Sequence, residues 1–170
     1  MRIIGIDLAG LETNETGFCV LDVVSKEDGE KDKVQVKRLL TDREILNEID
    51  EKNSKKKVDV IAIDAPFDFP KSGLYRPGEL KLLKRGFKPL SPLFPGMKPL
   101  TRRAKMLVRI LRDHGYNVIE VFANASEKIF GLNRGKAANK DEYDAMICAL
   151  TGKYYLKGRY ENVDGIIIPK

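Results

Sequence analysis

Two short segments of the sequence are apolar on both faces and end in an aspartate. The first is Arg2–Leu8 (RIIGIDL), which carries Asp7, and the second is Val58–Asp64 (VDVIAID). Continuous apolar runs of this length predict strands that are buried on both faces in the middle of a sheet. A buried carboxylate without a partner is costly, so Asp7 and Asp64 are expected at the rim of the core. One such aspartate can simply begin a loop or cap a helix, but two together favour a functional site.

The remaining pattern predicts a single mixed α/β domain. Gly17–Val24 and Val34–Leu40 are predicted strands, joined through a hairpin signal at Asp28-Gly29, and they form a meander with the first strand. The capping-box sequence Thr41-Asp42-Arg43-Glu44 begins a helix. The other expected elements are a short helix at Gly78–Lys84, a helix from Thr101 to His114, a strand at Asn117–Phe122, a helical turn at Ser126–Phe130, a helix at Asp141–Leu156, and an edge or covering segment at Ile166–Pro169.

Composition excludes several classes of protein. The chain has 170 residues, of which 42% are apolar and 33% charged, as in a globular domain with its own core. No apolar run approaches the roughly 18 residues of a membrane span, and the N-terminus begins in a strand rather than a signal peptide. We therefore expect a cytoplasmic protein without a membrane partner. Cys19 and Cys148 lie in apolar stretches without a C-x-x-C spacing, which predicts buried thiols.

Positive charge is concentrated in one part of the chain. Residues 66–100 form a Pro/Gly-rich insertion, and residues 71–105 hold ten basic side chains and one acidic one, whereas the whole chain has a net charge of +6. A local excess of this kind is typical of a surface that meets a polyanion, although a solvated basic surface would look the same. The candidate nucleic-acid-binding residues are Arg76, Lys84, Arg85, Lys98, Arg102 and Arg103.

The last predicted helix has one face that begins with carboxylates and continues with small residues. That face consists of Asp141, Asp144, Ala145, Cys148 and Gly152. On the predicted strands, Asp7 shares its face with Gly5, and Asp64 shares its face with Ala62. Small residues on both surfaces predict that the helix packs closely on the sheet and brings its two aspartates beside the two on the strands.

Carboxylates that converge in this way repel each other unless they are protonated or bind a cation. Glu120, inside the apolar strand Asn117–Phe122, would be a fifth member. An all-oxygen set selects a hard ion, Mg²⁺ or Mn²⁺, and the single histidine disfavours zinc or a Ser-His-Asp triad. Paired Mg²⁺ ions serve phosphoryl displacement. The alternatives are that Asp141 is only a helix cap and Glu120 only a surface residue.

These motifs resemble a known family. Gly5–Gly10 (GIDLAG), Ile63–Pro66 (IDAP), Val118–Val121 (VIEV) and Asp141–Thr151 (DEYDAMICALT) are similar, in order and spacing, to an uncharacterised family of predicted nucleases with a ribonuclease H-like fold, related in fold to Holliday-junction resolvases. The motifs span the chain from end to end. The sequence departs from the family pattern at Ala123-Asn124, where a proline is expected.

The resemblance implies a ribonuclease H-like domain over residues 1–170. Its sheet would have five strands, an antiparallel meander of three followed by parallel strands, with helices on both faces. It also implies a site for Mg²⁺ or Mn²⁺ formed by Asp7, Asp64 and Asp144, with Asp141 or Glu120 assisting. The implied activity is metal-dependent hydrolysis of a phosphodiester bond in nucleic acid.

Two other functions fit parts of the pattern. A phosphotransferase of the actin or hexokinase type uses a turn like Asp7–Gly10, with Thr13 or Thr16 near a phosphate, but it needs two such domains and hence a homodimer. A nucleic-acid-binding module without catalysis would need the basic segment but not the aspartates.

Overall fold

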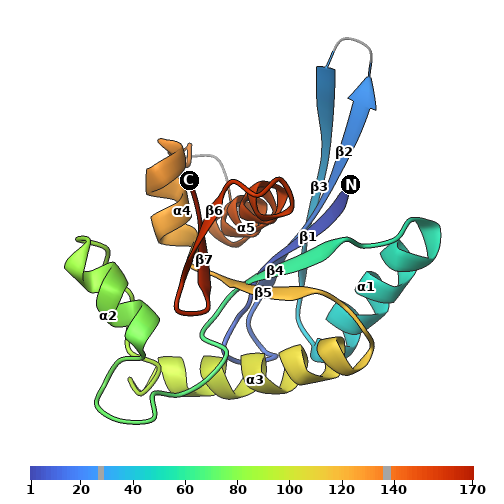
Figure 1. The fold of residues 1–170 in the computed structure, drawn as a ribbon. Helices are drawn as coiled ribbons and strands as arrows, with labels where there is room; N and C mark the ends of the chain where they lie inside the picture. Colours follow the sequence, from blue (N-terminus) through green and yellow to red (C-terminus); the bar gives the residue numbers. More distant parts are fainter. Residues whose placement is uncertain (27–28, 136–138) are drawn as a thin grey trace.

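A computed structural model describes residues 1–26, 29–135 and 139–170, and its centre is a seven-stranded mixed sheet (Figure 1). The strand order is β3-β2-β1-β4-β5-β7-β6. The first half of the Asp28-Gly29 turn lies outside the described residues. The strands are β1 Arg2–Asp7, β2 Thr16–Lys26, β3 Gly29–Leu39, β4 Val60–Asp64, β5 Val118–Val121, β6 Tyr160–Val163 and β7 Ile166–Pro169; the helices are α1 Asp42–Lys55, α2 Pro77–Lys84, α3 Met97–Asp113, α4 Ala123–Phe130 and α5 Lys140–Leu156.

The mixed α/β architecture is confirmed, but the expected number of five strands is wrong. The chain returns after α5 as a hairpin, β6 and β7, with Asp164 and Gly165 both at positive φ in the turn, as two-residue hairpin loops require. All four residues of β7 are buried, and β7 pairs in parallel with β5 on one side and antiparallel with β6 on the other. The C-terminal segment is therefore an interior strand, and β6 forms the edge.

Helices cover both faces of the sheet, and alternation along the strands divides the core between them. One face packs Ile4 and Ile63 against α1 and α3. The other packs Ile3 and Ala62 against α4 and α5. The predicted capping box at Thr41 is confirmed at the start of α1, and Cys19 and Cys148 are both buried free thiols. Across the described ranges, no helix has the length and apolar character needed to cross a membrane.

Helix α5 lies directly against the sheet, as the small residues predict. A Cβ atom at Gly5 would lie 2.1 Å from the carbonyl oxygen of Ala145, and one at Gly17 would lie 1.9 Å from that of Asp141. Both distances are impossible for real atoms, so only glycine permits this approach. The first turn of α5 is thereby fixed over the ends of β1 and β2.

The insertion at residues 66–100 is more helical than its prolines suggest. Helix α2 packs Leu82 against the β6–β7 hairpin. Helix α3 begins at Met97, so the expected start at Thr101 is wrong by four residues. Pro99 is tolerated because the first turn of a helix needs no backbone N–H donor there, and the Thr101 hydroxyl donates to the Met97 carbonyl at 3.0 Å. The insertion therefore runs from β4 into a long helix under the sheet.

Candidate functional site

Asp7 and Asp64 are neighbours at the carboxyl ends of two central strands. β1 and β4 pair in parallel with Asp7 opposite Asp64. Residues opposite each other in a parallel pair project from the same face, and adjacent strands are about 4.8 Å apart. The two carboxylates therefore stand side by side on the face that α5 covers.

Helix α5 adds Asp144 and a lysine to this group. Asn139 caps the helix by accepting a hydrogen bond from the Glu142 N–H at 3.1 Å. The Asp144 side chain is 19% exposed, and the Lys140 ammonium donates to its Oδ2 at 2.5 Å. Asp141 lies on the same helix turn, close enough to Asp7 to affect its titration. We name Asp7, Asp64, Asp144 and Lys140 the aspartate cluster.

The strand aspartates resist ionisation. Burial, followed by the charges of Asp64 and Asp144, raises the pKa of Asp7 to about 8. Burial likewise raises the pKa of Asp64 to about 7, with Asp144 adding to the shift. The positive charge of Lys140 acts in the opposite direction on both strand aspartates but does not cancel the effect. In this arrangement the two carboxyls tend to keep a proton near neutral pH.

The start of α4 supports the charged form of Asp64. A backbone hydrogen bond from Ala123, the first residue of the helix, lowers the pKa of Asp64 and so opposes the effect of burial. A helix N-terminus also favours a negative charge nearby. Because the donor is a backbone N–H, a proline at position 123 could not make this contact.

The donor chemistry of the cluster suits a hard divalent cation. Its donors are carboxylate oxygens whose mutual repulsion a cation would relieve. In the parts of the chain that the structure describes, however, no three Asp, Glu, His or Cys side chains are already arranged as a metal-binding group. The Asp144 carboxylate is instead bound to Lys140. A cation shared by the three aspartates would therefore have to compete with this ammonium.

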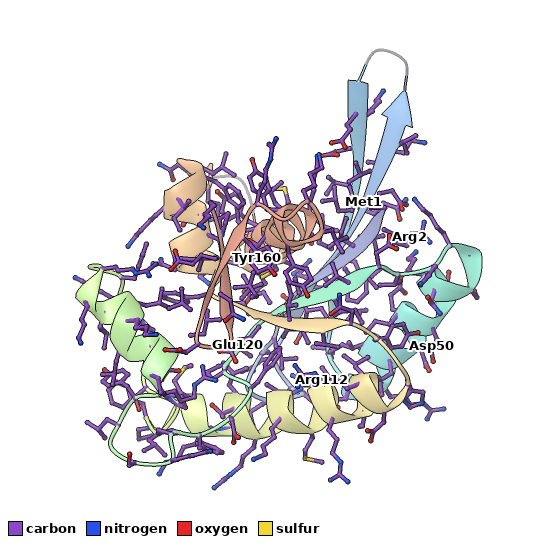
Figure 2. The ribbon with its side chains drawn as sticks, viewed as in Figure 1. Met1, Arg2, Asp50, Arg112, Glu120 and Tyr160 are labelled. Carbon is purple, nitrogen blue, oxygen red and sulfur yellow. The ribbon has the colours of Figure 1, made fainter. Side chains whose placement is uncertain are left out.

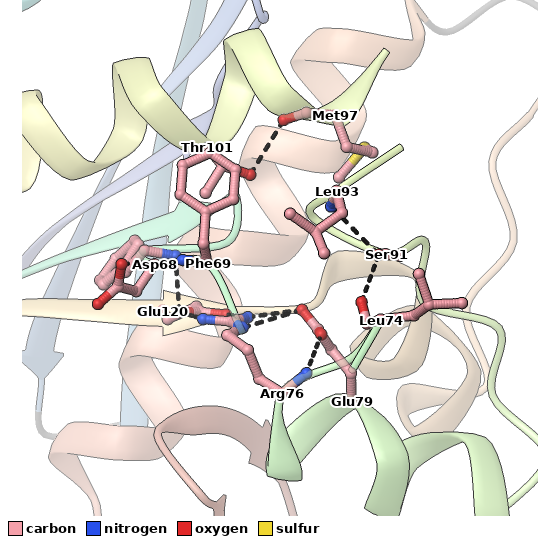
Figure 3. A network of polar contacts seen from close by, with 11 residues as sticks. Asp68, Phe69, Leu74, Arg76, Glu79, Ser91, Leu93, Met97, Thr101 and Glu120 are labelled. Atoms are coloured by element: carbon pink, nitrogen blue, oxygen red, sulfur yellow. Dashed lines mark hydrogen bonds and ion pairs between the residues drawn. The ribbon is translucent and has the colours of Figure 1, made fainter. Parts of the chain in front are cut away.

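Glu120 is not an open member of the cluster. Glu120 pairs in register with Ile63 rather than with Asp64. Its side chain therefore projects from the opposite face of the sheet to that of Asp64. Its carboxylate accepts from the Phe67 N–H at 3.0 Å and from both terminal nitrogens of Arg76 (Figure 3). Glu79 binds the same guanidinium. Glu120 thus joins the insertion to the end of β5 (Figure 2).

Three of the six basic residues predicted to bind nucleic acid form ion pairs with acidic side chains of the same chain. Arg76 binds Glu79 and Glu120, and Arg85 binds Glu161. Arg103 is only 7% exposed. Its guanidinium donates to Asp42 and to the carbonyl oxygens of Ala9 and Leu40, each at 2.8 Å. The other three, Lys84, Lys98 and Arg102, are exposed and make no ion pair within the described ranges.

Three hollows meet at the aspartate cluster, and Lys140 lines all of them. The first, here the covered cleft, has a volume of about 460 Å³ and lies between the cluster and the insertion. The second, of about 570 Å³, borders the β1–β2 turn and Asp141. The third, of about 390 Å³, runs past Asp144 toward Arg134. An extended substrate can therefore reach the aspartates from more than one side.

Sequence reasoning missed Lys140, and it named Arg76 as a nucleic-acid-binding residue rather than as the partner of Glu79 and Glu120. Lys140 stands four residues before Asp144, the spacing at which opposite charges meet on a helix, so the signal was present. The pairing of Arg76 with Glu79 has a similar signal at three residues, but its pairing with Glu120 does not. That contact joins residues 44 positions apart and depends on the fold.

Comparison of the sequence with models of protein families and with curated proteins finds no match.

Proposed function

We propose that this protein is a metal-dependent nuclease with a ribonuclease H-like fold. The observation that carries the proposal is the pair Asp7 and Asp64, two carboxylates in register on adjacent strands, with the charge of Asp144 close to both and no guanidinium paired with them in the described part of the chain. The ribonuclease H-like assignment is supported by the order of the first five strands. Three of them form the meander β3-β2-β1, and β4 and β5 continue it in parallel.

Asp7, Asp64 and Asp144 would hold Mg²⁺ or Mn²⁺. Such an ion stabilises negative charge on the attacking and leaving oxygens of a phosphodiester. Lys140 holds the Asp144 carboxylate at the cluster and would release it to the ion. Asp141 and Glu120, predicted as assisting residues, have different surroundings: Asp141 borders the second hollow, and Glu120 is held by Arg76.

The proposed substrate is nucleic acid. Lys98 and Arg102 expose their charges on the first part of α3, where the insertion that borders the cluster ends. Exposed cations that form no ion pair among the described residues, near a hollow that ends in carboxylates, suit a polyanion whose reacting phosphate lies at the aspartates.

Cleavage of end-labelled DNA and RNA oligonucleotides with Mn²⁺, with Mg²⁺ and with EDTA tests the proposal. We expect metal-dependent cleavage by the parent and loss of at least about a hundredfold in rate for Asp64→Asn, the scale expected for a group that stabilises transition-state charge. Asp113→Asn is the matched control, because that aspartate is 71% exposed at the end of α3. Equal cleavage by Asp64→Asn and the parent would contradict the proposal.

A further inference from the structure

The covered cleft differs from the other two hollows in having extensive apolar walls. Its inner end is formed by Asp7 and Asp64, and its polar rim by Lys88, Lys128, Lys140 and Asn124. Between these two parts lie apolar side chains from the insertion and from the segments that follow β1 and β5, together with the ion-paired group of Arg76, Glu79 and Glu120. The apolar lining residues include Leu8, Leu90, Met97, Leu100 and Phe122.

The size of the covered cleft suits one small group rather than a duplex. A volume of about 460 Å³ falls within the range of about 300–1,000 Å³ that is typical of sites for single small molecules. Paired bases are stacked inside a duplex and cannot enter such a space. Proteins that take one base out of the stack hold it between apolar or aromatic side chains.

The wall formed by the insertion is fixed in place. Arg76 ties the insertion to Glu120 of β5, and the Phe67 N–H makes a second bond to the same carboxylate (Figure 3). Within the insertion, the buried Ser91 hydroxyl donates to the Leu74 carbonyl and accepts from the Leu93 N–H. The cleft is therefore bounded on the insertion side by an ordered structure, not by a loop that must fold on binding.

The charges around the cleft match one nucleotide of a strand. Lys88 and Lys128 are exposed at the rim and make no ion pair in the described part of the chain, so they can face backbone phosphates. The apolar walls offer no hydrogen bond or charge to a phosphate, but they can stack against the faces of a base. The exposed amide of Asn124 provides both a donor and an acceptor for a base edge.

We propose that the covered cleft binds one unpaired nucleotide, with its base between the apolar walls and an adjoining phosphate at Asp7 and Asp64. This inference rests on the proposed function and narrows its substrate class to single-stranded or locally unpaired nucleic acid.

Leu90→Trp tests the inference by filling the cleft. Leu90 lines the cleft and is 57% exposed, so the larger ring can be added without disturbing the core. Leu74→Trp is the matched control: this leucine is 58% exposed on the same insertion and does not line the cleft. The probe is a fluorescein-labelled oligonucleotide, used single-stranded and annealed to its complement. Fluorescence anisotropy is measured with Ca²⁺ in place of Mn²⁺ to limit cleavage.

We expect the parent to bind the single strand more tightly than the duplex. Leu90→Trp should weaken binding of the single strand about tenfold, the scale expected for loss of one stacked base, and Leu74→Trp should leave it unchanged. Equal binding by the two variants, or a duplex bound as tightly as the single strand, overturns the inference while leaving the proposed function standing. Tighter binding of thymidine monophosphate than of the oligonucleotide also overturns it, because the ligand would then not be part of a strand. Absence of binding to every oligonucleotide overturns both.

Discussion

Two groups of carboxylates lie at the same end of the sheet: Glu79 and Glu120 are buried and paired with a guanidinium, whereas Asp7 and Asp64 are half-buried and, among the described residues, have no guanidinium partner. Glu79 and Glu120, 2% and 8% exposed, share the guanidinium of Arg76. Asp7 and Asp64 share no guanidinium, and the nearby Lys140 ammonium hydrogen-bonds Asp144. A buried acid paired with a guanidinium contributes to the scaffold, whereas half-buried acids without such a partner leave charge for a ligand to balance. The predictions below test this contrast.

The largest effect is expected from Arg76→Met. Removing the guanidinium leaves Glu79 and Glu120 buried without a partner, which should lower the free energy of unfolding by about 3–5 kcal/mol. Arg85→Met is the matched control, because its pair with Glu161 is at the surface and should contribute little. Urea unfolding of both variants measures the difference. Equal effects would mean that the Arg76 network is no more important than a surface pair.

The two groups should respond in opposite directions when a carboxylate becomes an amide. Glu120→Gln removes a charged acceptor from Arg76 and should cost about 1.5–3 kcal/mol. Asp7→Asn and Asp64→Asn remove repulsion and a desolvated charge, so in EDTA at pH 8 each should melt at the parent's temperature or above it. Melting curves of the variants and the parent in EDTA measure these differences. If both aspartate variants melt below the parent, Asp7 and Asp64 also stabilise the fold and the contrast with Glu120 is lost.

The stability of the metal-free protein should fall as pH rises through the neutral range. Because the pKa of Asp7 is raised to about 8 in the folded state from an ordinary value of 3.8, the folded state holds a proton between these values that the unfolded state has released. Asp64, whose pKa is raised to about 7, likewise keeps its proton in the folded state up to about that pH. This contribution is complete below about pH 4 and is lost as pH rises toward 8.

Asp7→Asn isolates that contribution. Asp22, whose pKa its hydrogen bond with Arg2 lowers, has the opposite pH dependence, and Glu120, whose pKa burial raises in spite of Arg76, has the same one, but both are common to parent and variant. We therefore expect that, in EDTA, the free energy of unfolding of Asp7→Asn rises relative to that of the parent between pH 5 and pH 8. If the stability of the parent and that of Asp7→Asn change with pH in parallel, the claim that the charge of Asp7 has no balancing partner is contradicted.

The smallest effect concerns the exposed cations on α3. Lys98→Ala with Arg102→Ala should flatten the dependence of nucleic-acid affinity on salt by about 0.7–0.9 units of log–log slope for each lost phosphate contact. Arg103→Ala should instead lower stability, since its guanidinium binds Asp42 and two backbone carbonyls inside the protein. An unchanged slope in the double variant would make these charges an ordinary solvated surface.

The sequence was sufficient to predict the features that depend on local spacing. The face of small residues on α5 and the glycines opposite it predicted close packing, and the capping box predicted the start of α1. Even the interior role of Arg103 had a signal, because it shares the apolar stripe of Leu107 and Leu111 on α3.

Features that depend on distant pairing were not predictable in this way. The four residues of β6 have no strong apolar alternation, and they become a strand only because β7 joins the sheet beside β5. Glu120 was predicted beside the aspartates because it too lies near the end of an apolar strand. Its role depends on a register shifted by one residue, opposite Ile63, and on Arg76 from the insertion.

Calorimetric titration of the metal-free protein with Mn²⁺ tests the central claim most directly, with Asp7→Asn and Glu120→Gln as the paired variants. We predict a saturable binding heat for the parent, its loss in Asp7→Asn, and its retention in Glu120→Gln, whose carboxylate is already committed to Arg76. Binding by Asp7→Asn equal to that of the parent would contradict the metal site proposed for Asp7, Asp64 and Asp144.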